Sequence, residues 1–288
     1  MRAERIYEVS GAGRWFPGEA RVLRRVVEQD MDCELPADLS FPLLGGIAPH
    51  AGFAYSGAVA GQTYAALRAS AAVAGVPAVV AVLGFSHRPA KPGLALLDAA
   101  QIRTPLGMLP VDQSATAHLL QSVQAARLDN ATHFGEHSAE NQLPFLQCAL
   151  QDVPVVVGLI CGQSPEVFGE LAQALTELHA ERSVVCIAST DLLHDPSYER
   201  VCDSDAQTLR MMEKLDSEGL LKAWSPAHQV CCGIAPVTAL LRFMRASGGQ
   251  QGTILCYQNS GDIDPSSRGH WVVGYGAVVY SRGGEQRR

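Results

Sequence analysis

The sequence predicts an α/β fold in which a mostly parallel central sheet is covered by helices on both faces. Short, continuously apolar runs alternate with longer segments of helical periodicity. Strands that are apolar on both faces are typical of sheets covered on both sides. Of the 288 residues, 47% are hydrophobic and 18% are charged, enough apolar material for a large core. With no internal repeat and no linker-like stretch, we expect one domain over residues 1–288, with a frayed tail at 282–288.

The expected elements follow in chain order. Six apolar runs are expected to be buried strands: residues 43–48, 78–84, 153–160, 183–189, 253–257 and 271–280. Six segments are expected to be helices: residues 57–70, 113–126, 138–149, 165–180, 196–216 and 235–246. Ser164-Pro165 and Asp195-Pro196 each resemble an N-cap followed by proline at the first helical position. Residues 94–111 lack helical periodicity, and the turn residues 104–107 predict two short strands there.

Composition excludes several classes of function. The net charge is −7 and no long basic run occurs, so nucleic acid is not an expected partner. No apolar run is long enough to span a bilayer, and no apolar h-region follows the N-terminal residues, so we expect a cytoplasmic protein without a secretory signal or membrane insertion. The eight cysteines are scattered without a CxxC pair, which indicates reduced thiols rather than disulfides. Dinucleotide and P-loop fingerprints are missing, so no nucleotide cofactor is expected.

Histidines follow three of the expected strands. His50 follows strand 43–48, His87 follows strand 78–84, and Asp191 and His194 follow strand 183–189. In open α/β sheets, ligands bind beyond the carboxyl ends of the strands. Imidazole is the commonest metal ligand in proteins and the usual general base. A single histidine after a strand is more often a loop or capping residue, but three such placements together favour a site.

Two further positions fit either a functional or a structural role. Cys231 and Cys232 precede helix 235–246, and a thiol at a helix N-terminus has a lowered pKa. We expect at most one of them to face the pocket, as a ligand or nucleophile, and two small buried hydrophobes are the alternative. His137 precedes a helix for which Ser138 is the expected cap, so a surface position fits as well as a pocket role.

The other histidines carry less information. His118, His179 and His228 have no partner pattern and are expected at the surface or hydrogen-bonded in the core. The sequence does not assign His133. His270 precedes the last strand, and it would lie at the opposite edge of the sheet from the site if that strand were parallel.

Read in order, eight short motifs resemble those of the Memo family. They are AGRWFP at 12–17, PHAGFAYSG at 49–57, GFSH at 84–87, TPLG at 104–107, EHSAENQLPF at 136–145, STDLLH at 189–194, Cys232-Gly233 and VGY at 273–275. The resemblance covers nearly the whole chain. The departures are Phe85 in place of proline, Thr190 in place of serine, Ala139 in place of a larger apolar residue and Asp195 where an aromatic residue is common.

The resemblance implies a fold and a metal site. The Memo family is similar in fold to the class III extradiol ring-opening dioxygenases, which use non-haem iron(II) to insert oxygen beside a catechol hydroxyl. By this resemblance, His50 and His87 occupy the two metal-ligand histidine positions. Cys232 stands where the dioxygenases place a carboxylate. We expect these three ligands to converge on one ion, at roughly 2.0–2.3 Å from it.

The resemblance also implies three candidate catalytic residues. Asp191 and His194 fall at the pocket wall, with His194 near the acid/base histidine of the dioxygenases. His137 is implied as a second pocket histidine. Because Asp191 and His194 are three residues apart, one helical turn would place them on the same face, where the carboxylate could orient the imidazole.

Two functions from different classes follow. In the first, the pocket binds copper or iron, with zinc also compatible, and the protein takes part in redox control or signalling; the family is linked to cell motility and to phosphotyrosine-type peptides. In the second, the protein is an iron(II) dioxygenase acting on a small aromatic substrate. We favour metal binding because the thiolate of Cys232 is softer than a carboxylate and prefers copper(I) or zinc, although Asp191 could still supply a carboxylate.

Overall fold

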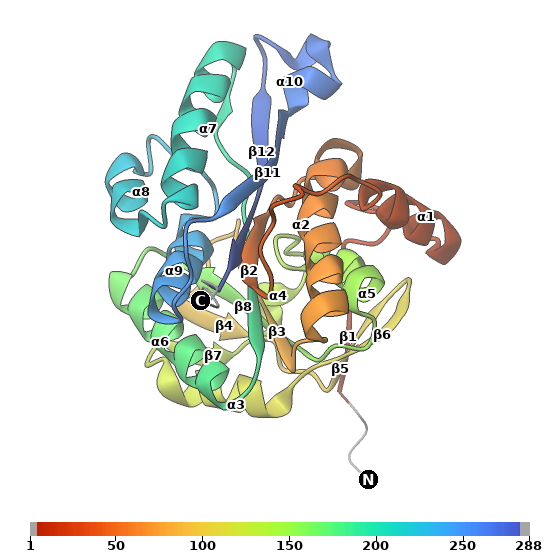
Figure 1. Cartoon of the computed structure of the whole chain (residues 1–288), viewed down its shortest axis with the longest axis vertical. Helices are drawn as coiled ribbons and strands as arrows, with labels where there is room; N and C mark the ends of the chain where they lie inside the picture. Colours follow the sequence, from red (N-terminus) through yellow and green to blue (C-terminus); the bar gives the residue numbers. More distant parts are fainter. Residues whose placement is uncertain (1–4, 283–288) are drawn as a thin grey trace.

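A computed structural model describes residues 5–282 (Figure 1). The strands are β1 (Ile6–Glu8), β2 (Leu43–Ala48), β3 (Val79–Phe85), β4 (Gly93–Leu96), β5 (Gln101–Thr104), β6 (Gly107–Pro110), β7 (Ala126–Leu128), β8 (Val155–Cys161), β9 (Val184–Ser189), β10 (His194–Asp195), β11 (Thr253–Asn259) and β12 (Val272–Ser281). The helices are α1 (Ala20–Asp30), α2 (Phe53–Ala74), α3 (Gln113–Ser122), α4 (Asn130–His133), α5 (Leu143–Leu150), α6 (Pro165–Glu181), α7 (Tyr198–Glu213), α8 (Ser217–Ala223), α9 (Ile234–Ala246) and α10 (Ser260–Ile263), with two 3₁₀ helices, η1 (Glu140–Gln142) and η2 (Pro265–Ser267). Residues 283–288 of the expected frayed tail lie outside the described residues.

The six expected strands and six expected helices are all present, with changes at their ends. Ser164 caps α6 as expected, because its side chain accepts the amide hydrogen of Val167. The cap expected at Asp195 is wrong. Asp195 belongs to β10, and Ser197 caps α7 instead. The expected helix 138–149 begins as η1 and continues as α5, and Ser138 bonds to the end of β3 rather than capping it.

The central sheet is mixed, so the expectation of a mostly parallel sheet is wrong. Its strand order is β10-β12-β2-β9-β3-β8-β4-β7, and β11 pairs with β12. The strands β2, β9, β3 and β8 are parallel to one another, as the continuous apolar runs predict. β12 runs antiparallel to β2 and to β11, because only the short α10 and η2 separate β11 from β12. On the other side, β4 runs antiparallel to β8.

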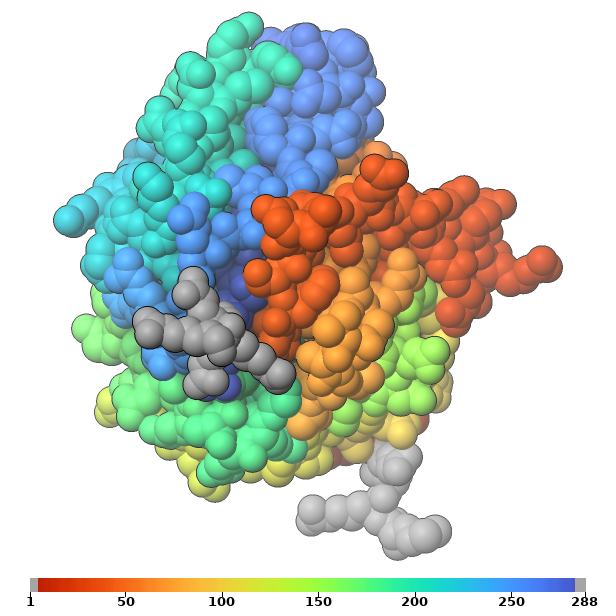
Figure 2. Space-filling view, in the orientation of Figure 1, coloured from red at the N-terminus to blue at the C-terminus, as the bar shows by residue number. Residues whose placement is uncertain are grey.

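Helices cover both faces of this sheet. One apolar core packs α3, α6 and α9 against the sheet, and a second packs α1, α2 and α5 against the opposite face (Figure 1). The strands β1, β5 and β6 form a separate small sheet that includes the expected turn at 104–107. Segments distant in sequence meet at the surface, where α2 packs against β11 and β12 (Figure 2, orange and blue).

The parallel strands bring the candidate residues to one edge. Since β2, β3 and β9 are parallel, their carboxyl ends, and the loops that follow them, lie together. β12 is antiparallel to β2, so its first residues also lie at this edge, and His270 is not at the opposite edge. Within residues 5–282, no helix has the length and apolarity needed to cross a membrane.

Candidate metal centre

The imidazole of His50 is held in one tautomer by the end of β9. His50 is only 1% exposed, and its Nδ1 lies 2.9 Å from Oγ of Ser189. That hydroxyl donates its single hydrogen to the carbonyl oxygen of Ser138, at 2.5 Å, and accepts a hydrogen from Nε2 of Gln142. Nδ1 of His50 must therefore be the donor to Ser189. This leaves Nε2 unprotonated, with its lone pair free for a ligand.

A buried carboxylate fixes His87 in the same way. Glu136 is 2% exposed and accepts both the backbone amide hydrogen of His87, at 2.8 Å, and the Nδ1 hydrogen of its ring, at 2.9 Å. Burial alone would raise the pKa of Glu136, but the hydrogen bonds and charge of His87 lower it to about 2. In the neutral ring, which is the form that binds a metal, the single N–H is on Nδ1 and points to this carboxylate, so Nε2 is the free nitrogen.

The segment before η1 is clamped to the end of β3. Oγ of Ser138 donates to the carbonyl oxygen of Phe85, at 2.6 Å, and accepts its amide hydrogen, at 3.1 Å. A Cβ atom at Gly84 would lie 2.5 Å from the same Oγ, so this close approach requires glycine. The clamp places His137 beside His87.

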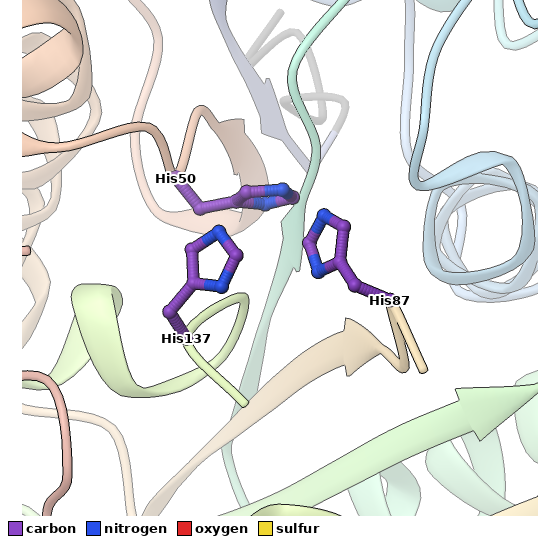
Figure 3. Close-up of side chains that lie close together, drawn as sticks. All are labelled: His50, His87 and His137. Atoms are coloured by element: carbon purple, nitrogen blue, oxygen red, sulfur yellow. The ribbon is translucent and has the colours of Figure 1, made fainter. Parts of the chain in front are cut away.

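The ring of His137 lies in a stack. It packs face to face on Trp15, with ring centroids 3.8 Å apart, and lies nearly parallel to the ring of His87, whose centroid is 4.5 Å away. The His50 ring is perpendicular to both histidines. Figure 3 shows the three imidazoles around a common space. Burial, together with the nearby His50 and His87, lowers the pKa of His137 to about 3, so its ring is neutral at physiological pH.

Cys232 faces the same space from the start of α9. Its Sγ lies 3.4 Å from Nε2 of His50 and accepts the amide hydrogen of Asp191 at 3.2 Å, whereas Cys231 is fully buried in the core. The expected lowering of the thiol pKa is wrong for this pair. Burial raises the pKa of Cys232 well above its usual value, and the carboxylate of Asp191 raises it further.

Asp191 and His194 are not joined by a hydrogen bond. The helical turn expected between them is not formed: residues 191–193 have no regular secondary structure, and His194 begins β10. The Asp191 carboxylate accepts the amide hydrogens of His50, at 2.8 Å, and Ala51, at 3.3 Å. Nε2 of His194 is buried without a hydrogen-bond partner among residues 5–282, and the ring lies nearly perpendicular to that of Trp271. Both His194 and Cys232 line a pocket of about 330 Å³.

The candidate ligands fall into two groups that share His50. In one group, His50, His87 and His137 each offer a ligand atom within 4.8 Å of the others. In the other, His50, Asp191 and Cys232 do the same. The expected set of His50, His87 and Cys232 is divided between the two groups. A transition-metal ion suits either donor set, since imidazole, thiolate and carboxylate are its usual protein ligands.

Comparison with known proteins identifies the family. The family model described as "Memo-like protein" matches residues 8–279. The chain belongs to the Memo-like protein family. It is 32% identical to a MEMO1 family protein of Methanopyrus kandleri, over 94% of this chain and 98% of that one. It is 33% identical to a MEMO1 family protein of Thermotoga petrophila, over 93% and 97% of the two chains.

A solved structure shares the fold of this Memo-like chain. It is the uncharacterised protein JW3007 of Escherichia coli K12, with a TM-score of 0.51 and 13% identity. The match covers 83% of this chain and 99% of that one. At this identity, the likeness extends to the fold alone.

Three residues of this Memo-like pocket were not expected from the sequence. They are Glu136, Ser189 and Trp15, which bond to or stack on the candidate ligands. Glu136 directly precedes His137, and an acidic residue beside a histidine was the available signal. Trp15 and Ser189 lie in motifs of the family resemblance, but no local pattern links them to the histidines, because these partners lie far away in the sequence.

The remaining histidines of this Memo-like chain are structural or lie beside the pocket. His133, which the sequence did not assign, is buried and hydrogen-bonded to the carbonyl oxygen of Ala95. His118 and His179 bond to backbone groups, as expected of histidines without a ligand role. His228 is exposed and lines the 330 Å³ pocket with His194.

Proposed function

We propose that this Memo-like protein binds one transition-metal ion in the pocket, with Nε2 of His50, Nε2 of His87 and the thiolate of Cys232 as ligands. The supporting observation is that Ser189 and Glu136 each fix a tautomer that leaves Nε2 free. In addition, Sγ of Cys232 lies 3.4 Å from Nε2 of His50. Two ligands of one tetrahedral ion are roughly 3.5 Å apart, given bond lengths of about 2.0–2.3 Å, and the pair of His50 and Cys232 meets this spacing. His87 and Cys232 do not fall within one group of ligand atoms, so the proposal requires the partly exposed His87 ring to move toward Cys232 when an ion binds.

The ligand chemistry favours a soft metal. A thiolate with two imidazoles suits copper(I) or zinc better than iron(II). Burial keeps the thiol of Cys232 protonated in the metal-free protein, so binding an ion releases that proton. We infer a role in metal handling linked to redox control or signalling, rather than turnover of an aromatic substrate.

The test is a metal titration of protein purified without an affinity tag. Under anaerobic conditions, copper(I) and zinc should bind at one ion per chain in competition with a chelator of known affinity. His87→Ala and Cys232→Ser should each weaken binding by at least about 100-fold, since each removes a direct ligand. His118→Ala, far from the pocket, is the matched control. Equal affinity of all three variants would exclude this site.

A specific feature also favours the dioxygenase function. Nε2 of His194 is buried beside the 330 Å³ pocket and has no hydrogen-bond partner in the part of the chain that the structure describes. Oδ2 of Asp191 lies 4.0 Å from Nε2 of His50. Iron(II) oxygenases use two histidines and one carboxylate.

The test of the dioxygenase function is to load the protein anaerobically with iron(II) and then add oxygen and a panel of catechols. Ring-opened yellow product over multiple turnovers, lost in His87→Ala, would establish the dioxygenase. Its absence, together with Cys232-dependent copper(I) binding, would support metal handling.

A further inference from the structure

We propose that the pocket contains a second ion position, formed by the imidazoles of His50, His87 and His137, that does not require Cys232. The proposal rests on the proposed function only in that the pocket admits metal ions. It assigns a ligand role to His137, which the resemblance implied only as a second pocket histidine.

The nitrogen atoms are already positioned for one ion. One ring nitrogen from each of His50, His87 and His137 lies within 4.8 Å of the other two. The rings surround the same space in Figure 3. Nε2 is free on His50 and on His87, and neither ring nitrogen of His137 has a hydrogen bond to any residue within 5–282. Three uncommitted imidazole nitrogens around one space are an all-nitrogen donor set.

The ring of His137 is held in place by the N-terminal segment. The carboxylate of Glu140 accepts the amide hydrogens of Ser10 and Gly11, each at 2.8 Å. The carbonyl oxygen of Gly11 then accepts the amide hydrogen of Trp15, and the Trp15 ring packs on His137. A ligand that is held before the ion arrives loses little conformational entropy on binding. The stack therefore favours His137 as a ligand.

The local charge and access also suit a divalent ion. The ionised carboxylate of Glu136 lies 2.9 Å from Nδ1 of His87 and 3.5 Å from Nδ1 of His137, so one buried negative charge supports two ligand rings. The His87 side chain is 35% exposed, which gives the ion a route from solvent.

The two ion positions exclude each other. Nδ1 of His50 is committed to Ser189, so Nε2 is its one ligand nitrogen, and both positions need it. The pocket therefore holds one ion at a time. A thiophilic ion such as copper(I) is expected on the Cys232 side, and a divalent ion that prefers imidazole, such as nickel(II) or copper(II), on the His137 side.

The test uses cobalt(II), whose absorption reports its ligands. A thiolate ligand adds a charge-transfer band in the near ultraviolet, whereas the visible bands report coordination geometry. Cys232→Ser should still bind one cobalt(II) per chain, with visible bands and no thiolate band. Adding His137→Phe to that variant should weaken binding by at least about 100-fold, since phenylalanine keeps the stack but removes the nitrogens. His137→Phe alone should retain the thiolate band.

The outcomes separate this inference from the proposed function. If wild type binds cobalt(II) but Cys232→Ser does not, the second position is excluded and the proposed function stands. If the double variant binds as tightly as Cys232→Ser, His137 is not a ligand and the inference is likewise overturned. A third outcome is that wild type binds cobalt(II) without showing a thiolate band, and that His137→Phe abolishes this binding. That outcome would support the inference and exclude Cys232 as a ligand. His137→Gln, checked for folding by near-ultraviolet circular dichroism, should reproduce the effect of His137→Phe.

Discussion

The proposed ligand set depends on two oxygen atoms that do not face the candidate ion position. Oγ of Ser189 and Oε1 of Glu136 each bind the Nδ1 atom of one histidine and so determine which nitrogen is free. Glu136 also accepts the amide hydrogens of His87 and Ser138, which fixes the backbone as well as the ring. Partners of this kind commonly contribute 10- to 100-fold to metal affinity.

We therefore expect Glu136→Gln to weaken metal binding by about 10- to 100-fold without removing it. Glutamine is similar in size, but its neutral amide cannot supply the charge that supports the ligating imidazole. A chelator competition with zinc measures the change. The exposed Glu177→Gln is the control, since its carboxylate lies near His118 and far from the pocket. An affinity equal to that of wild type would mean that Glu136 serves the fold alone.

At this scale, the sequence predicted the ligand candidates better than their partners. His50 and His87 could be placed because each directly follows an apolar run. Asp191 and His194 were placed at the correct edge but with the wrong local structure. The helical spacing implied a shared face, yet the carboxylate of Asp191 binds backbone amides of the loop after β2. Such long-range hydrogen bonds leave no local pattern in a sequence.

Among the structural elements, α7 holds the loop that carries the pocket residues. The carboxylate of Asp205 accepts the amide hydrogen of Leu193, at 3.0 Å, and the hydroxyl hydrogen of Tyr257, at 2.9 Å. A Cβ atom at Gly274 would lie only 1.8 Å from this carboxylate, so α7 can approach β12 only because residue 274 is glycine. The loop between β9 and β10 is thus fixed from α7 and β11 together.

This contact predicts a dependence of stability on pH. Burial raises the pKa of Asp205 from its usual 3.8 to about 7. Because the folded state holds this proton more tightly than the unfolded state, the contribution of Asp205 to stability is complete below about pH 4 and is lost as pH rises through about 7. At 1.36 kcal/mol per pKa unit, this loss amounts to roughly 4 kcal/mol.

Asp205→Asn should remove most of that loss. Denaturant unfolding at pH 4 and at pH 8 measures it, as the change in the free energy of unfolding between the two. The change should be smaller in Asp205→Asn than in wild type. The exposed Asp203→Asn should behave as wild type does. Parallel pH profiles for wild type and Asp205→Asn would contradict the raised pKa.

Helices and strands could be predicted from the sequence where the hydrophobic periodicity is strong. The direction in which each strand runs in the sheet could not be predicted. The buried strands β2, β3, β8 and β9 match the continuous apolar runs to within two residues at each end. α1 was not predicted, although it buries Leu23 and Val27 on one face, because many charged residues surround them. The antiparallel direction of β12 depends on the short connection through α10 and η2, which has no hydrophobic signature.

For the whole molecule, an ion bound at the proposed site would join distant parts of the chain. His50 follows β2, His87 follows β3 and Cys232 precedes α9, so unfolding separates the proposed ligands. An ion that binds only the folded state at 100 times its dissociation constant stabilises that state by about 2.7 kcal/mol.

We therefore expect zinc to raise the melting temperature of wild type in a concentration-dependent way. The shift should largely disappear in His50→Ala, which removes the ligand common to both ion positions. Differential scanning calorimetry with and without a chelator measures the effect. A shift that persists in His50→Ala would mean that the ion binds elsewhere.

The position of β2 inside the sheet has a consequence for how the protein is made. β2 lies between β9 and β12, which the ribosome adds more than 130 residues later in the chain. Until β9 has been synthesised, His50 lacks Ser189, and its ring has no partner to select a tautomer. His87 and Glu136, by contrast, both belong to the first half of the chain. Assembly of the pocket is therefore among the last events of synthesis, and a chain released before Cys232 would carry the three histidines without their completed sheet.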